Sequence, residues 1–352
     1  MQIESLRKLL YTNLNWHPAR ILTFYNLIKS IILCKSVTVK NMAVHIESKG
    51  NIRAKIAKIE RLFSKQNFDY NIIAKIILGM LAVISPYIVA IDRTNWQFGK
   101  SNLNFFVASI VIHNISVPFC WILLDKKGST STAERIDLIK KILSIIGKEN
   151  IKIVLGDREF IGEEWLKYLY NEQIPFAMRA KKNEQLKHHN GGKISLEKYF
   201  SRSEEESSKE IIFYGIKLNA TYLKIKKDML FIISNSVIGE SALTAYKKRW
   251  SIERAFKALK TSGFNFENTH ITNQIKLAKL FSVAAISLAI CVISGEIKNE
   301  IYEIKTKKHG RKAFSLFTYG LDWLRDYFSS KNVHNLKRLF NLLNWRISQA
   351  FT

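Results

Sequence analysis

Cysteine is scarce in this sequence, and its scarcity excludes two common ways of stabilising a fold. Only three of the 352 residues are cysteines, Cys34, Cys120 and Cys291, and they lie far apart among apolar residues. A disulfide framework or a zinc site requires cysteines, alone or with histidines, at short regular spacings. We therefore expect three small buried hydrophobic side chains in a protein of the reducing cytoplasm.

The sequence also lacks a run of apolar residues long enough to cross a membrane. The longest run, Leu280–Ile293, falls short of the roughly 20 residues that a bilayer requires, and it predicts a buried helix. The N-terminus, MQIESLRKLL, does not have the order of basic, apolar and small residues that marks a secretory signal. We expect no residence in a membrane.

Acidic residues are few compared with basic ones. Lys and Arg number 55 against 29 Asp and Glu, which gives a formal net charge of +26. Such an excess implies a polyanionic partner, either nucleic acid or an anionic membrane surface. The alternative explanation is an AT-rich genome, whose codons favour lysine, but we expect codon bias to account for only part of this charge.

The first part of the chain is predicted to be helical. Thr38 can cap a short helix that runs through Glu47, and a turn signal at 48–51 separates it from a second helix over 52–63. The second helix has one apolar face and one basic face, the latter made by Lys55, Lys58, Arg61 and Lys65. This pattern is typical of a helix–turn–helix with a basic outer face. A plain helical hairpin with a solvated charged side is equally compatible with it.

From Pro86 onward the apolar pattern changes to that of strands. We expect strands over 87–92, 103–112, 116–124, 151–155 and 175–181, and helices over 132–146 and 162–171. His113-Asn114 is the expected hairpin turn between the second and third strands. Three meandering strands followed by alternating helices and strands predict a mixed α/β sheet with helices on its faces.

The second half of the chain continues with a polar stretch over 182–209, which suits an exposed insertion. Two strand-like segments follow at 211–226 and 229–234. A long helix is expected from Ser241 or Thr244 through Lys260, and an apolar helix over about 275–294. The tail from Glu296 is basic and contains amphipathic stretches at 313–328 and 333–345.

Two aspartates, Asp92 and Asp157, end predicted strands. Functional sites in α/β sheets cluster at the carboxyl ends of strands. An aspartate in such a place is also a common turn former or helix cap, so neither residue alone identifies a site.

The predicted helix that ends at Lys260 strengthens the case for a site. Tyr246, Arg249, Glu253 and Lys260 lie at offsets that place all four within an arc of roughly 60° on a helix. A carboxylate flanked by an arginine, a lysine and a tyrosine is suited to holding phosphates around a metal ion. The alternative is a solvated face with ion pairs at helical spacing, which does not account for Tyr246 and Trp250 on the same side.

With these motifs the chain resembles bacterial insertion-sequence transposases of the DDE type. The branch is the IS-four family, to which the transposon-five transposase belongs, and its signature Y-x2-R-x3-E-x6-K is matched in full by Tyr246, Arg249, Glu253 and Lys260. The sequence DRTNW beginning at Asp92 resembles the family's DRT-x-W, and the GDREF that contains Asp157 matches its second motif. The three motifs together are specific, whereas each alone is weak.

The resemblance implies an RNase H-like catalytic core with a mixed five-stranded sheet, interrupted by a β-rich insertion. It divides the chain into a helical N-terminal DNA-binding region (1–84), a core in two parts (85–182 and 244–295), the insertion (183–243) and a helical C-terminal region (296–352) for dimerisation. The expected partners are double-stranded DNA, as terminal inverted repeats and as target, and a second copy of the chain. The expected compartment is the bacterial cytoplasm, with the protein on the nucleoid when bound to DNA.

The resemblance also implies a mechanism of phosphoryl transfer with two Mg²⁺ ions, which Mn²⁺ can replace. Asp92 would bridge both ions, while Asp157 and Glu253 would each bind one. The element's ends would be cleaved, through a hairpin in this branch, and the freed 3′-OH would attack target DNA.

The DNA contacts implied by the resemblance lie around this site and on the N-terminal helices. Arg249 and Lys260 would grip phosphates, Tyr246 would contact the DNA backbone, and Lys55, Lys58 and Arg61 would contact the terminal repeats. Arg93 and Arg158 either face DNA or pair with nearby carboxylates, and His270 is either a contact of the site or a structural histidine.

Two other functions compete with transposition. One is a catalytically inactive DNA-binding inhibitor of transposition, against which the intact acidic triad argues. The other is an RNase H-like DNA nuclease, which would need neither the insertion nor a pairing tail.

Overall fold

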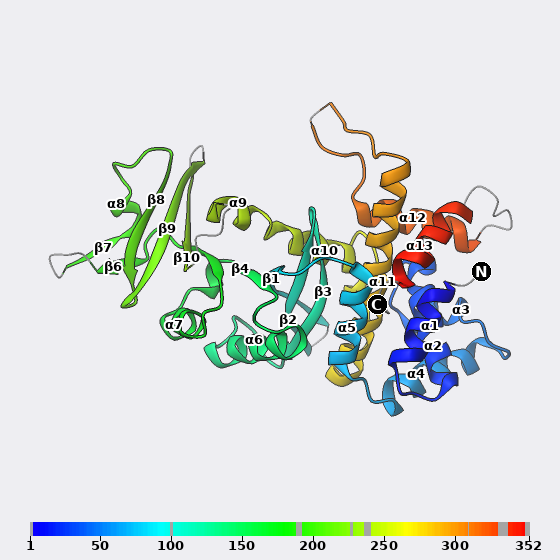
Figure 1. Ribbon diagram of the computed structural model, residues 1–352. Helices are drawn as coiled ribbons and strands as arrows, with labels where there is room; N and C mark the ends of the chain where they lie inside the picture. Colours follow the sequence, from blue (N-terminus) through cyan, green and yellow to red (C-terminus); the bar gives the residue numbers. More distant parts are fainter. Residues whose placement is uncertain are drawn as a thin grey trace.

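An eight-stranded mixed sheet extends from the left end to the centre of the computed structural model in the view of Figure 1. The structure describes residues 3–98, 101–187, 192–225, 228–235, 241–308, 310–329 and 337–348. In spatial order the strands are β3 (Ile115–Leu124), β2 (Ser101–Ile112), β1 (Tyr87–Phe98), β4 (Ile151–Gly156), β5 (Phe176–Ala180), β10 (Asp228–Ser234), β9 (Ile216–Ile225) and β8 (Glu206–Phe213). The two pairings of β4, with β1 and β5, are parallel, and the other pairings are antiparallel.

The predicted core strands are all present, and β1 is longer than expected. It does not end at Asp92 but continues to Phe98, because β2 continues to pair with it as far as Phe98↔Ser101. Its parallel pairing with β4 stops earlier, at Ala90↔Leu155. Asp92 therefore lies just beyond the point where β1 separates from β4.

The insertion extends the core sheet instead of standing apart from it. β10 pairs with β5, and β9 and β8 follow as the outer strands, while β6 (Gln185–Lys187) and β7 (Lys193–Ser195) form a small separate sheet beside α8 (Leu196–Tyr199). The segment predicted as one strand over 211–226 contains, in its described part, the end of β8, a turn and the whole of β9, which form a hairpin. Tyr214 and Gly215 have φ of 52° and 79°, the left-handed conformation that a tight hairpin turn requires.

The helices agree with the predicted regions, with two differences. Helices α6 (Thr132–Ile146) and α7 (Glu163–Asn171) are found as expected. The expected helix over 38–47 is only α3 (Val39–Val44), and the long helix through Lys260 is divided into α9 (Ala242–Lys247) and α10 (Trp250–Leu259). At the joint, Arg249 N donates to Tyr246 O and Ile252 N to Arg249 O. These three-residue hydrogen bonds are those of a tight 3₁₀ turn, so the chain keeps its direction across the break.

A helical body packs against the β3 edge of the sheet (Figure 1). It contains α1 (Glu4–Asn13), α2 (Pro18–Cys34), α3, α4 (Ile52–Lys65), α5 (Tyr70–Leu81), α11 (Gln274–Ile301), α12 (Leu316–Ser329) and α13 (Lys337–Ser348). The start of the amphipathic stretch predicted at 333–345 lies outside the described residues. Ser5 Oγ donates to Asn344 Oδ1 at 2.7 Å, which joins the first described helix to the last.

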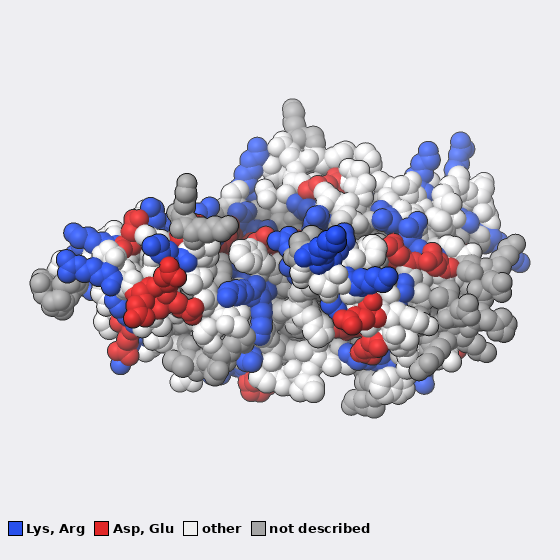
Figure 2. Space-filling view, turned by 90° about the horizontal axis from the view of Figure 1, so that it is seen from above, with Lys and Arg blue, Asp and Glu red and all other residues white. Residues whose placement is uncertain are grey.

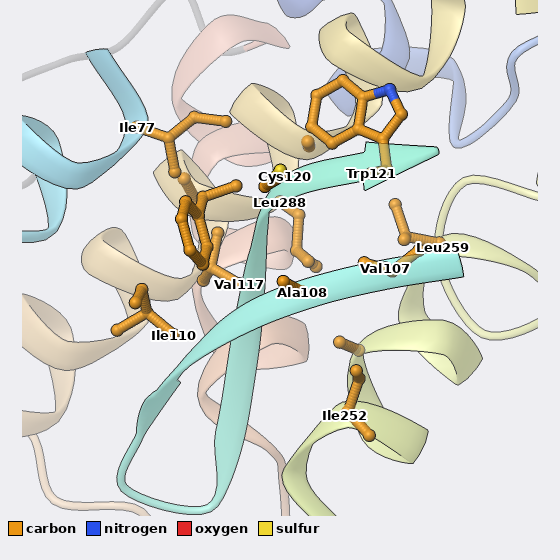
Figure 3. Packing of buried hydrophobic residues seen from close by; sticks show 14 of the residues in the cluster. Ile77, Val107, Ala108, Ile110, Val117, Cys120, Trp121, Ile252, Leu259 and Leu288 are labelled. Atoms are coloured by element: carbon orange, nitrogen blue, oxygen red, sulfur yellow. The ribbon is translucent and has the colours of Figure 1, made fainter. Parts of the chain in front are cut away.

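Helix α11 is the centre of this body and contacts α2, α5, α12 and β3. Figure 3 shows how Leu288 of α11, Ile77 of α5 and Ile252 of α10 meet apolar side chains of β2 and β3. Among the described helices, α11 alone is long and apolar enough to cross a membrane, and its most apolar stretch is entirely buried inside the protein. Core helices of soluble proteins have the same properties.

Helices α11 and α12 cross at very short range. A Cβ added to Gly320 would lie 1.9 Å from the carbonyl oxygen of Cys291, and one added to Gly295 would lie 1.9 Å from that of Leu316. Only glycine permits backbones to approach this closely. Cys120 and Cys291 are buried as predicted, and Cys34 is half-buried.

Candidate active site

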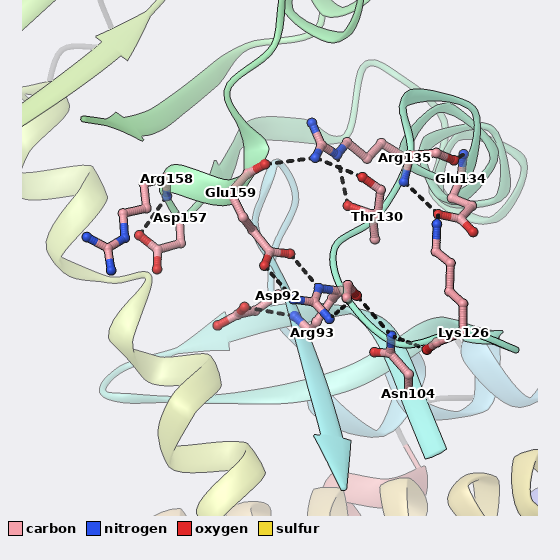
Figure 4. A network of polar contacts seen from close by, with 12 residues as sticks. Asp92, Arg93, Asn104, Lys126, Thr130, Glu134, Arg135, Asp157, Arg158 and Glu159 are labelled. Atoms are coloured by element: carbon pink, nitrogen blue, oxygen red, sulfur yellow. Dashed lines mark hydrogen bonds and ion pairs between the residues drawn. The ribbon is translucent and has the colours of Figure 1, made fainter. Parts of the chain in front are cut away.

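Asp92 and Asp157 lie where strands β1 and β4 separate. Asp157 directly follows β4, and its carboxylate accepts a hydrogen bond from the backbone N–H of Arg158 at 2.6 Å. Asp92 Oδ1 accepts one from the N–H of Arg93 at 2.8 Å. Figure 4 shows Asp92 on β1 and Asp157 in the loop that directly follows the neighbouring strand β4. The parallel pairing of β1 and β4 brings together two residues that lie far apart in the sequence.

Arg249 joins Asp92 to the helix that carries Glu253. Its Nη1 lies 3.3 Å from Asp92 Oδ2, and its Nη2 lies 2.6 Å from Glu253 Oε1. Its Nε donates to the phenolic oxygen of Tyr246 at 3.0 Å. The Arg249 side chain is only 4% exposed, whereas that of Glu253 is 52% exposed. One buried cation is therefore shared by two carboxylates and a phenol.

Burial makes Asp92 a poor place for a negative charge. The loss of hydration raises the pKa of Asp92 to about 7, although Arg249 and the Arg93 N–H lower it. Asp157 raises it further and also contributes to the raised pKa of Arg249, so its charge acts on the same cluster. Burial likewise raises the pKa of Tyr246 to about 12, which keeps this phenol neutral.

The donor set is suited in kind to Mg²⁺, which prefers carboxylate oxygens. Within the described residues, however, no three Asp, Glu, His or Cys side chains lie close enough together to hold one ion. Asp92 and Glu253 each contact a nitrogen of the Arg249 guanidinium. In this arrangement the Arg249 guanidinium already compensates the negative charge of the two carboxylates.

Comparison with known protein families identifies the family of the chain that carries this cluster. The model of the transposase DDE domain matches residues 84–290, from just before β1 into α11. The chain belongs to this family. It is a transposase, an enzyme that acts on DNA, and the match includes both strand aspartates and the whole Tyr246–Lys260 segment.

Two further comparisons add little to the family assignment. No curated protein matches the chain. Among solved structures, the crystal structure of endonuclease V from Bacillus subtilis is similar over 58% of this chain and 84% of that chain, at 12% identity and a TM-score of 0.28.

In this transposase Arg93 pairs with a carboxylate, one of the two roles that the sequence left open. Its Nε and Nη2 contact the two carboxylate oxygens of Glu159, each at 2.8 Å, and its Nη1 donates to Gly128 O at 2.6 Å (Figure 4). The carbonyl of Glu159 in turn accepts from Arg135 at 2.8 Å. The positioning roles of Glu159 and Arg135 were missed by the sequence reasoning, although Glu159 lies within the GDREF motif.

The remaining residues singled out in the sequence are distributed around the transposase core. Arg158 is exposed, and its side chain lies on the same side of the loop as Asp157 (Figure 4). Lys260 is not brought to Glu253, because its Nζ donates to Asn95 O at 3.0 Å and pairs with Glu267 at 2.9 Å. The exposed His270 packs its ring edge-on against Phe98.

The predicted DNA-reading residues Lys55, Lys58 and Arg61 lie on α4 in the helical body, apart from α9 and α10 (Figure 1). Arg61 is exposed, and Lys58 contacts Ser48 Oγ at 3.4 Å. The structure therefore separates a basic helix from the carboxylate cluster within one chain.

Proposed function

We propose that this chain catalyses cut-and-paste transposition of an insertion sequence. Strands would be cleaved at the terminal inverted repeats, through a hairpin as in the IS-four branch, and the freed 3′-OH would be joined to target DNA. The observation that carries the proposal is that Asp92 and Glu253 share the buried guanidinium of Arg249, with Asp157 directly after the neighbouring strand β4.

The carboxylates have a direct role in this proposal. Asp92, Asp157 and Glu253 would hold Mg²⁺ or Mn²⁺, which supplies activation of the attacking oxygen and stabilisation of the leaving oxygen. Burial around Asp92 favours the binding of a cation there. Burial raises the pKa of Asp92 to about 7 because its ionised carboxylate has lost hydration, and a bound cation can replace that hydration.

Arg249 would bind and position a DNA phosphate once Asp92 and Glu253 no longer pair with it. A guanidinium offers a planar set of donors that fits a phosphate as well as a carboxylate. The hydrogen bond with Tyr246 would hold the arginine in place while Asp92 and Glu253 take up metal ions. In this proposal Tyr246 acts mainly by positioning Arg249, since its side chain is buried in an apolar cluster with Leu155 and Ile232.

The other proposed DNA contacts lie further out. Arg158 and Lys260 would contact the backbone near the cleaved bond, and Lys55, Lys58 and Arg61 would contact the terminal repeats. A homodimer would hold two transposon ends together, with residues 296–352 as the proposed pairing region.

The decisive experiment is cleavage of a labelled duplex that carries the element's own terminal repeats, with Mg²⁺ or Mn²⁺. Wild type should give nicked or hairpin products and, with a second duplex, joined products. Asp92→Ala, Asp157→Ala and Glu253→Ala should abolish all of them. Glu164→Ala is the matched control, because Glu164 is exposed on α7 and should have no effect.

The competing functions give different results in the same assay. Tight binding of the ends without cleavage in either metal would favour an inhibitor. Cleavage without any joined product would favour a nuclease. Cleavage that survives Glu253→Ala would mean that the third carboxylate has been wrongly assigned.

A further inference from the structure

The segment between α11 and α12, described at residues 302–308 and 310–315, forms an arm that projects from the helical body and is called the basic arm below. Its described residues run out and back as a narrow ribbon, since Lys307 N donates to Arg311 O at 2.8 Å and Ala313 N to Lys305 O at 2.9 Å. Thr306 and Lys312 form an antiparallel bridge between the two sides. In Figure 1 this basic arm rises above the end of α11, on the side of the molecule where α9 and α10 lie.

The root of the basic arm is fixed to both neighbouring helices. Ile304 is buried, and its N–H donates to Asn299 Oδ1 of α11 at 3.0 Å. On α12, the Tyr319 hydroxyl donates to Tyr302 O at 3.0 Å, and the Tyr319 ring stacks with Phe314. These contacts set the direction in which the arm projects, so its side chains are presented by a defined support.

The arm carries a concentrated positive charge. Its cations are Lys305, Lys307, Lys308, Arg311 and Lys312, and its one acidic residue is Glu303. Lys312 lies 3.8 Å from Glu303. Lys305, Lys307 and Lys308 are exposed, and none of them has an ion-pair partner among the described residues. Seen from above, Lys and Arg side chains gather near the middle of this face, where the arm rises toward the viewer (Figure 2).

This combination of shape and charge fits duplex DNA. A two-stranded ribbon can enter the major groove of B-DNA, which is about 12 Å wide. Lysines on the ribbon then reach phosphates on both sides of the groove, and each neutralised phosphate releases counterions. An ammonium group is a point charge that reads no particular base, so such contacts are independent of sequence. Tyr302 and Phe314, exposed by 57% and 52%, flank the arm with aromatic surface.

We propose that the basic arm is a second DNA-binding surface of this chain, and that it holds duplex DNA of any sequence outside the carboxylate site. This inference rests on the proposed transposition, because a transposase must hold target DNA as well as the transposon ends. Target DNA has no fixed sequence, whereas the terminal repeats do. The arm therefore supplies a type of contact that a sequence-reading helix does not.

The test compares matched lysine pairs in the full-length protein. One variant is Lys307→Ala/Lys308→Ala on the arm, and the control is Lys140→Ala/Lys148→Ala, at exposed positions on α6 and just after it. Binding to a labelled duplex of unrelated sequence is measured by fluorescence anisotropy at several salt concentrations, without divalent metal. The dependence of log affinity on log salt should become shallower by about 2 in the arm variant, since each phosphate contact contributes about 0.9 to the slope.

The control pair should leave the slope unchanged, and Lys307→Arg/Lys308→Arg should keep the parent slope because it keeps the charge. Both alanine variants should keep the parent's melting temperature, because the four lysines are exposed. An arm variant with the parent slope would overturn the proposal. So would a parent that does not bind the unrelated duplex, or arm-dependent binding to anionic phospholipid vesicles without binding to DNA.

Failure of the arm and failure of the transposition proposal can be told apart. If the parent cleaves its terminal repeats while the arm variant keeps the parent slope, only the arm proposal is wrong. If the parent binds unrelated DNA through the arm but cleaves no repeat, the arm is a DNA-binding surface and the proposed transposition is wrong. When both hold, the arm variant should still nick terminal repeats but should join them to unrelated DNA at least several-fold more slowly.

Discussion

Asp92→Asn should stabilise the metal-free protein more at pH 8 than at pH 5. The Asp92 side chain is only 18% exposed, and burial raises its pKa from 3.8 to about 7. A pKa raised in the folded state means that the ionised carboxylate is less favourable there than in the unfolded chain. The neutral form has no such penalty. Stability that is fully present below pH 4 is therefore lost as the pH rises through about 7.

The size of this effect follows from the pKa shift. A rise from 3.8 to about 7 is roughly 3 units, and each unit corresponds to about 1.4 kcal/mol. The ionised Asp92 therefore costs ~4 kcal/mol at pH 8. The pKa of about 7 already includes the attraction of Arg249, so this cost is net of that ion pair. Asparagine cannot ionise and avoids the cost. The gain is therefore ~4 kcal/mol at pH 8 and only ~2 kcal/mol at pH 5, where the carboxylate ionises in the unfolded chain alone. Arg249 keeps Glu253 and Tyr246 as partners in the variant.

Thermal unfolding in EDTA at pH 5 and pH 8 measures the difference. The variant should melt several degrees above wild type at pH 8, and this difference in melting temperature should be clearly smaller at pH 5. Asp137→Asn, on the outer face of α6, serves as a control that should show no such dependence. Added Mg²⁺ should raise the melting temperature of wild type more than that of the variant. If Asp92→Asn lowers the melting temperature equally at both pH values, the ion pair with Arg249 outweighs the burial of the carboxylate and our reasoning fails.

Two further predictions concern the guanidinium and the helix crossing. Arg249→Gln should raise the affinity of the DNA-free protein for Mn²⁺ several-fold in a spectroscopic titration, because no internal cation then competes for Asp92 and Glu253. Lys248→Gln is the control. Equal Mn²⁺ affinities of the Arg249→Gln variant and wild type would show that Arg249 does not compete. Gly320→Ala should lower the melting temperature strongly or prevent folding, because its Cβ would lie 1.9 Å from a carbonyl oxygen of α11. Gly192→Ala is the control and should leave the melting temperature unchanged, because nothing lies within 4 Å of a Cβ at that position. A well-folded Gly320→Ala protein would show that the crossing of α11 and α12 can relax.

The core strands could be predicted from the sequence because their patterns are local. Each strand within residues 87–124 and 151–180 is marked by a run of apolar residues, and each strand end is marked by a turn signal. The length of β1 could not be predicted, since it depends on pairing with β2. The hairpin of β8 and β9 was missed because Tyr214-Gly215 lies inside one continuous alternating pattern, and only its positive φ angles mark the turn.

The same distinction applies to the site. The candidate carboxylates Asp92, Asp157 and Glu253 could be singled out because each lies in a short motif. The contact of Arg93 with Glu159 spans 66 positions in the sequence, and no periodic pattern predicts a contact between a strand and the turn that follows another strand. Lys260 was grouped with Glu253 by helical spacing alone. In the structure the side chain turns instead to Asn95 and Glu267, which neighbouring segments bring within its reach.

The position of Arg249 was predicted in part by the helical spacing of the sequence and is given in part only by the structure. Helical spacing correctly placed it beside Glu253 and Tyr246, as the contacts at 2.6 and 3.0 Å show. The spacing gave no indication that the 3₁₀ joint would direct the same side chain into a buried site against Asp92. On the proposed function, a DNA phosphate that engages Arg249 frees the two carboxylates, and a metal ion that engages the carboxylates frees Arg249. Each ligand therefore removes the competitor of the other, and by linkage each must raise the other's affinity by the same factor.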